Sequence, residues 1–230
     1  MEWNAPEKPA EITEKRLIEA IMDGHFPINS YLPGERDLAE QLGVTRPTLR
    51  EAMQRLARDG WLEINHGKPT RVRNYLQEGN LAVLASIASH HDHLPDNFIY
   101  DLLSVRGLLA PAYTRLALEK QADGLIPLLE KLASLSEDAG AYAAADWNLH
   151  CQLTLLSGNP VFTLILNGFK DLYPAIGEIY FRSPEARSSS KQFYRDLLAC
   201  AQEGDALRAQ ALTEQVMDDS LEIWRRITKG

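Results

Sequence analysis

The sequence predicts a mainly α-helical protein in two parts, the first of which also contains a small β-hairpin. Three observations support this fold class. Apolar residues recur at helical spacing along most of the 230 residues. One pair of short alternating segments occurs between residues 61 and 73, and strand signals vanish from about Leu81 onward. We place the boundary near residue 75, which gives an N-terminal domain of residues 1–75 and an all-α bundle of residues 76–230.

The N-terminal domain begins with two predicted helices. Apolar residues at helical spacing indicate the first helix over residues 11 to 23, and Gly24 supplies a stop signal. The stretch "PINSYLPGE" contains two prolines and predicts a loop. A second, short helix follows over residues 35 to 42, and Gly43 ends it.

A third helix is predicted from residue 46 to about residue 59. Thr45 is a suitable N-cap, and Pro47 falls in the first turn, where its missing N–H costs nothing. Arg46 and Arg50 lie four positions apart and share one side of this helix. The apolar face lies on a different side and comprises Leu49, Ala52, Met53 and Leu56. Helix, glycine corner and helix predict a helix-turn-helix over about residues 35–54.

A small β-hairpin follows this helix. After Gly60, the stretch "WLEI" alternates like a strand, "NHGK" has turn composition, and "PTRVRN" can return as a partner strand. This hairpin predicts a wing over about residues 61–73. Its tip holds His66, Gly67 and Lys68, where Gly permits close approach of the backbone, and Lys or a protonated His can meet phosphates.

Charge is divided unevenly between the two parts. The chain has a formal charge of −8, yet residues 36 to 73 carry eight Lys and Arg against five Asp and Glu, a net charge of +3 that leaves −11 for the remainder. A basic helix-turn-helix on an acidic body predicts a polyanionic partner. Any single arginine is more often a solvated residue on a helix face. Together, however, the geometry, the basic wing tip and the local charge favour DNA, with Arg46 and Arg50 as candidates for base edges and Lys68 for phosphates.

Other classes of protein are disfavoured by what the sequence lacks. Cys151 and Cys200 show no C-x-x-C spacing, so neither a zinc ribbon nor a disulfide framework is expected. No run of eighteen apolar residues and no secretory signal occur, which predicts a cytoplasmic protein without a membrane partner. An acyl-thioester hydrolase is also disfavoured, because no G-x-S-x-G elbow occurs and adjacent His150 and Cys151 diverge on a helix.

The second part is predicted to be a bundle of six or seven helices. Stop and cap signals separate them, as in "SGNP", where Gly158 stops one helix, Asn159 caps the next and Pro160 fits its first position. We expect Pro111 to bend or interrupt one of these helices, and we expect a bend near Pro174 in another. The predicted helices cover residues 79–89, 96–118, 123–137, 141–156, 160–181, 185–203 and 205–228.

Several polar or aromatic residues fall on otherwise apolar helices of this bundle. Each one alone is more readily explained as a satisfied core residue, but the set suggests a ligand pocket. Ser220 and Trp224 lie four positions apart on the last helix. The set comprises Arg106, Asp146, Trp147, His150, Tyr173, Tyr180, Ser220 and Trp224.

Several stretches of the sequence resemble a known family. The stretch "LPGERDLAEQLGVTRPTLREAMQRLARDGWLEINHGKPT" is similar to the winged helix of the GntR family of bacterial regulators. Further segments, "DLLSVR", "SGNPVFTLILNGFKDLY", "YFRSPEAR" and "EIW", resemble its acyl-CoA-responsive branch, which regulates fatty-acid metabolism. These segments cover nearly the whole chain and occur in the expected order.

The resemblance implies a repressor or activator that binds a palindromic operator in double-stranded DNA as a homodimer. It also implies an effector domain that takes a long-chain acyl-CoA, with no cofactor and no catalytic residue. Pro47 departs from the pattern, since the family has a hydroxyl residue there, so one phosphate contact is in doubt. The implied DNA contacts are Arg36, Thr45, Arg46, Thr48, Arg50, His66, Gly67 and Lys68. The implied ligand contacts are Arg106, Tyr173, Tyr180, Ser220 and Trp224.

Two alternatives remain open for the second domain. A related branch of the family begins a metal site with D-x-x-x-H, as in Asp146 and His150, and adds two later histidines. No histidine follows His150 here, so we favour a hydrogen-bonded pair and expect no metal. A small carboxylate effector, bound through Arg106 or through such a metal, is the second possibility. The run "SHHDH" at residues 89 to 93 is interpreted as a solvated loop between helices.

Overall fold

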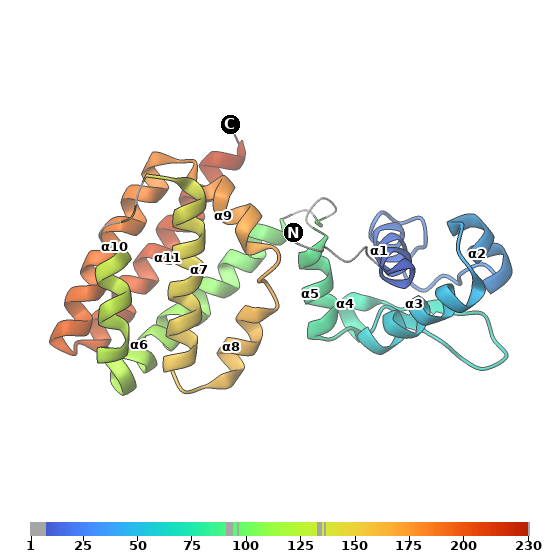
Figure 1. Cartoon of the computed structure of the whole chain (residues 1–230), viewed down its shortest axis with the longest axis horizontal. Helices are drawn as coiled ribbons and strands as arrows, with labels where there is room; N and C mark the ends of the chain where they lie inside the picture. Colours follow the sequence, from blue (N-terminus) through green and yellow to red (C-terminus); the bar gives the residue numbers. More distant parts are fainter. Residues whose placement is uncertain (1–7, 91–93, 96, 133–134, 136, 230) are drawn as a thin grey trace, which may run out of the picture. The chain divides into compact units, whose positions relative to one another are not determined.

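The computed structural model describes residues 8–90, 94–95, 97–132, 135 and 137–229. The chain divides into two compact units, Met1–Pro95 and Asp96–Gly230. In the described part of the chain, the first unit combines helices with a short hairpin, and the second unit contains helices without strands (Figure 1). The predicted fold class is therefore confirmed. Among the described residues, no helix is both long and apolar enough to span a bilayer.

Three helices form the centre of the first unit. They are α1 (Pro9–Met22), α2 (Glu35–Leu42) and α3 (Arg46–Asp59). The side chain of Thr45 accepts a hydrogen bond from the backbone N–H of Thr48 at 3.3 Å, so the predicted N-cap of α3 is present. Helix α3 packs against α1 and buries Leu49 and Leu56 completely. The helix-turn-helix is thus formed by α2, the corner at Gly43, and α3.

The predicted wing is present and is very short. Strand β1 (Leu62–Glu63) pairs antiparallel with β2 (Arg71–Val72), and the register places Leu62 opposite Val72. An isolated bridge between Tyr31 and Arg71 adds a third backbone segment beside β2. Between the strands, the exposed turn carries the residues predicted for the wing tip.

Two further helices belong to the first unit. They are α4 (Tyr75–Glu78) and α5 (Leu81–Ser89). The ring of fully buried Trp61 lies 4.7 Å from that of Tyr75, so the segment after the wing packs back on it. The two compact units divide at residue 95, whereas the domain boundary predicted from the sequence lies near residue 75. His91 and His93 of the predicted loop lie outside the described residues.

The second unit is built around one long helix. Helix α6 (Phe98–Leu132) contacts α7 (Ala139–Leu156), α10 (Pro184–Glu203) and α11 (Ala206–Lys229). Figure 1 shows these helices gathered about α6 within the unit. The break predicted between residues 118 and 123 occurs at Gln121, whose φ of −151° is not helical. Pro111 is buried inside the helix and does not interrupt it.

The segment after α7 differs from the single bent helix that was predicted over residues 160–181. It forms two separate helices, α8 (Pro160–Asn167) and α9 (Tyr173–Phe181). Asn159 caps α8 by accepting a hydrogen bond from the N–H of Val161 at 3.1 Å, as expected. Pro174 lies in the first turn of α9, so this proline begins a helix and does not bend one.

Two glycines at helix ends should differ in how they tolerate a side chain. Gly43 has a φ of +67° and open space around an added Cβ, whereas at Gly60, with a φ of +105°, the Cβ would lie 3.2 Å from the backbone of Gly79. We expect Gly43→Ala to lower the free energy of unfolding by about 1 to 2 kcal/mol from backbone strain alone. Gly60→Ala should cost more, because α4 must also shift. Urea denaturation of the full chain, followed by circular dichroism, would measure both; equal losses would contradict the packing at Gly60.

Candidate functional site

The start of α3 presents an accessible cluster of polar side chains. The guanidinium of Arg46 is exposed and has no hydrogen bond or ion pair with any residue that the structure describes. The hydroxyl groups of Thr45 and Thr48 lie 2.8 Å apart beside it. Arg50 lies one turn further along α3, and its Nε donates to Oε2 of Glu35 on α2 at 2.6 Å. The first two turns therefore offer one unpaired guanidinium and one anchored guanidinium.

The other two arginines of α3 form ion pairs with nearby carboxylates. Arg55 pairs with Glu51 at 2.7 Å and lies 3.6 Å from Glu14 of α1. Arg58 pairs with Asp59 at 2.7 Å. The excess positive charge of this helix is therefore balanced at its C-terminal end and available at its N-terminal end. Such an arrangement suits an α-helix that meets a polyanion with its first turns.

The turn of the wing completes the accessible basic surface. His66, Gly67 and Lys68 are all exposed, and Gly67 has a φ of +73° that suits the turn. Arg36 is also exposed and pairs with its neighbour Asp37 at 3.0 Å. Of the eight predicted DNA contacts, Thr48 alone is half-buried and the others are exposed. All eight belong to the first unit.

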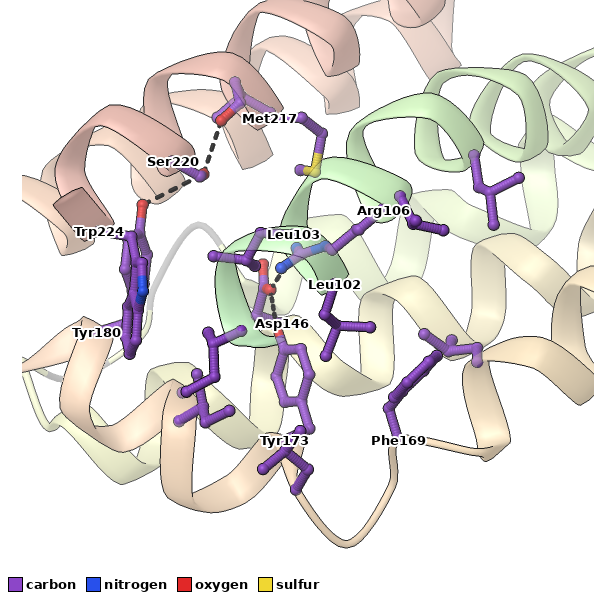
Figure 2. Close-up of a pocket in the computed structure, with 18 of the residues that line it drawn as sticks. Leu102, Leu103, Arg106, Asp146, Phe169, Tyr173, Tyr180, Met217, Ser220 and Trp224 are labelled. Carbon is purple, nitrogen blue, oxygen red and sulfur yellow. Dashed lines mark hydrogen bonds and ion pairs between the residues drawn. The ribbon is translucent and has the colours of Figure 1, made fainter. Parts of the chain in front are cut away.

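The second unit contains a large cavity. Its hollow measures about 1090 Å³, including space open to solvent, and its walls are mainly aliphatic and aromatic side chains from α6, α8, α9 and α11. The five predicted ligand residues all line it: Arg106, Tyr173, Tyr180, Ser220 and Trp224. Trp147 does not line it but packs its ring 4.9 Å from that of Tyr173. Figure 2 shows Arg106 and Asp146 between Tyr173 on one side and Met217 on the other.

A buried ion pair forms the polar centre of this cavity. Nη2 of Arg106 donates to Oδ2 of Asp146 at 3.0 Å. Asp146 also accepts hydrogen bonds from the hydroxyl groups of Tyr173 and Tyr194, the latter at 2.9 Å. Burial alone would raise the pKa of the Asp146 carboxyl, but Arg106 and these hydroxyl groups hold it below its usual value. The carboxylate is therefore ionised and fully hydrogen-bonded.

His150 is held neutral beside this pair. Burial and the charge of Arg106 lower its pKa to about 3, against a smaller opposing effect of Asp146. Its Nε2 lies 2.5 Å from Nη2 of Arg106, which has only protons to donate, so Nε2 must accept. The proton of the neutral ring therefore lies on Nδ1, which donates to the hydroxyl oxygen of Tyr113 at 2.7 Å.

The predicted direct hydrogen bond between Asp146 and His150 is not formed. Oδ2 of Asp146 and Nε2 of His150 lie 3.8 Å apart, and the Arg106 guanidinium bridges them. Within the described part of the chain, no three His, Cys, Asp or Glu residues are placed to hold a metal ion.

Sequence reasoning missed two members of this network. Tyr113 lies seven residues after Arg106, hence on the same face of α6, and this spacing was a signal that could have included it. The contact of Tyr194 with Asp146 joins residues 48 apart in the sequence, and no local pattern indicates it.

Comparisons with known proteins agree with both halves of this description. Residues 9–72 match the model of bacterial regulatory proteins of the gntR family, and residues 73–230 match the FadR C-terminal domain. A fatty acid metabolism regulator protein of Klebsiella pneumoniae is 43% identical over 97% of this chain and 94% of its own length. One from Shewanella frigidimarina is 42% identical over 95% and 92%. The solved structure of Lar, described as controlling the Listeria monocytogenes agr system, shares the fold, with 17% identity, a TM-score of 0.56, and coverage of 97% of this chain and 99% of that chain.

The neutral state of His150 makes the stability of the protein depend on pH. Because its folded pKa of about 3 lies below the ordinary 6.5, the unfolded chain binds the proton first as pH falls. The stabilisation that neutral His150 gives to the folded state is complete above pH 6.5. It is lost on acidification towards pH 3, by about 1.4 kcal/mol per pH unit. We expect His150→Gln to remove this slope from urea denaturation curves between pH 6 and 4. His25→Gln, at an exposed position, should retain it; a slope unchanged in His150→Gln would contradict a neutral His150.

Proposed function

The chain belongs to the FadR branch of the GntR family of bacterial transcription regulators, and from this premise we propose how it acts. It regulates genes of fatty-acid metabolism in the bacterial cytoplasm by binding a palindromic operator as a homodimer. A long-chain acyl-CoA bound in the helical unit releases it from DNA. The protein is a regulator and not an enzyme. The observation that carries the DNA half of this proposal is the accessible pair Arg46 and Arg50 at the start of α3.

The two arginines suit the reading of base edges. A guanidinium can donate two parallel hydrogen bonds to O6 and N7 of guanine in the major groove, which a helix can enter. Arg46 and Arg50 share one side of α3, which is not the buried side that contains Leu49. The threonine hydroxyl groups, Arg36 and the wing tip with Lys68 then hold the register on phosphates. His66 and Gly67 allow that tip to approach the backbone or the minor groove closely.

The cavity supports an effector with a long hydrocarbon chain. Its lining is mainly apolar, and burial of ten methylene groups yields roughly 8 kcal/mol before the costs of association. Inverting a two-state equilibrium requires about 5.5 kcal/mol of differential affinity, so a fatty chain can supply enough energy to switch the protein.

The buried ion pair argues against a small carboxylate effector. The charge of Arg106 is already balanced by Asp146 at 3.0 Å. A ligand carboxylate at Arg106 would therefore bring a second, unbalanced negative charge into the cavity, at a substantial desolvation cost. A neutral thioester brings no such charge.

Calorimetry with oleoyl-CoA, a sugar acid and a dicarboxylate separates these effectors. Tight binding of either acid alone would contradict the acyl-CoA proposal.

Substitutions at the DNA surface should separate base reading from phosphate binding. We expect Arg46→Ala and Arg50→Ala each to cost about 1 to 3 kcal/mol of operator binding and to relax the preference for particular bases. Lys68→Ala should weaken binding to all sequences alike and reduce the dependence on salt. Gel-shift titrations on operator and scrambled duplexes measure both effects. Unchanged discrimination in both arginine variants would refute their assignment to base edges.

Release by the effector requires reciprocal coupling. If acyl-CoA lowers the affinity for the operator, operator DNA must lower the affinity for acyl-CoA by the same factor. We expect oleoyl-CoA to change the tryptophan fluorescence, because Trp224 lines the cavity and Trp147 packs on Tyr173. Titrations with operator, with scrambled DNA and without DNA give the factor. Equal affinities for oleoyl-CoA in all three would contradict the gating mechanism.

A further inference from the structure

Glu35 lies beside the arginine that reads DNA in the proposed function, and its role extends beyond charge. It is the first residue of α2, and its Oε2 accepts from Nε of Arg50 at 2.6 Å. Both side chains are well exposed, with 39% and 63% of their surfaces accessible. An exposed ion pair contributes little to the stability of a fold. The main consequence of this contact is therefore the orientation that it gives to Arg50.

The contact selects one edge of the guanidinium. An arginine can donate a pair of hydrogen bonds through its Nε and one Nη, or through both Nη atoms. In Arg50 the carboxylate of Glu35 occupies Nε, while Nη1 and Nη2 have no partner among the described residues. The edge left available is the Nη1–Nη2 edge, which has the two parallel donors that guanine O6 and N7 require.

We propose that Glu35 is a positioning residue for base recognition: it holds Arg50 so that the Nη1–Nη2 edge meets the base pair. This inference rests on the proposed binding of operator DNA. Arg46 has no such anchor in the described part of the chain and must lose its rotamer freedom when it binds. Arg50 is already ordered by Glu35, which reduces the entropy cost of its contact.

The same carboxylate lowers affinity for DNA in general. A negative charge beside the phosphate backbone opposes binding to every sequence alike, because that binding is electrostatic. Glu35 therefore exchanges some overall affinity for discrimination between base pairs. The opposite role, a carboxylate that merely competes with DNA for Arg50, makes a different prediction: its removal would strengthen operator binding and leave discrimination intact.

A double-mutant cycle on the full-length chain tests this role. A random duplex pool first yields the preferred operator, and Arg50→Ala identifies the base pair whose recognition depends on Arg50. Discrimination is the ratio of affinities for the operator and for a duplex changed at that base pair. We expect Glu35→Ala to lower this ratio about twofold to tenfold, the range set by ordering one long side chain. In the Arg50→Ala background, Glu35→Ala should change the ratio no further.

Two variants control for charge and for geometry. Glu40→Ala removes a carboxylate from an exposed position of the same helix and should strengthen binding to both duplexes with the ratio unchanged. Glu35→Gln retains an oxygen that can accept from Nε and should restore part of the ratio. Thermal unfolding by circular dichroism verifies that each variant is folded.

The outcomes separate the inference from the function on which it rests. A ratio unchanged in Glu35→Ala, or an equal fall in the Arg50→Ala background, would overturn the positioning role alone. Stronger operator binding at an unchanged ratio, as expected for Glu40→Ala, would assign Glu35 to competition instead. A wild-type chain that selects no sequence from the pool would overturn the proposed function and this inference with it.

Discussion

Burial of the Arg106 guanidinium beside Asp146 constrains the whole helical unit. Removing two charges from water costs several kcal/mol for each ion, and the pair is tolerated only if hydrogen bonds satisfy both partners. Asp146 meets this demand through hydroxyl groups from two further helices, Tyr173 of α9 and Tyr194 of α10. Four helices must therefore converge on one point, α6 and α7 with the charges and α9 and α10 with the hydroxyl groups. The apolar cavity is the space that remains beside this point.

Arginines in the two units illustrate how environment decides the role of one side chain. In the cavity, the charge of Arg106 is neutralised by Asp146, and the neutral His150 accepts one more of its protons. On α3, the exposed Arg46 retains its full charge and all of its donors in the described structure. Buried arginine organises a core, and exposed arginine is available to a polyanion. The acidic net charge of the chain conceals this difference, because it averages over both.

Local signals allowed much of the fold to be predicted. Thr45 and Gly43 mark the ends of helices through hydrogen bonds and backbone angles that involve only a few neighbouring residues. Where the prediction failed, packing between elements that are distant in the sequence determined the structure. Pro111 was expected to bend or interrupt a helix, but it lies buried within α6 without interrupting it, and the break falls at Gln121, between two helices that were predicted separately. The packing of the Tyr75 ring on Trp61 also has no counterpart in periodicity.

For the candidate site, too, one part could be predicted from the sequence and another could not. The resemblance to a known family selected the five predicted side chains that line the cavity, from a larger set of polar and aromatic residues on apolar helix faces. The hydrogen bonds to Asp146 were beyond prediction, since they join positions 27 to 48 residues apart. Pro111 also affects how α6 can bend. It lacks the N–H that would donate to the carbonyl of Gly107, so one backbone hydrogen bond of the helix is missing directly after Arg106. The missing hydrogen bond makes this helix easier to bend in the stretch that carries the buried guanidinium.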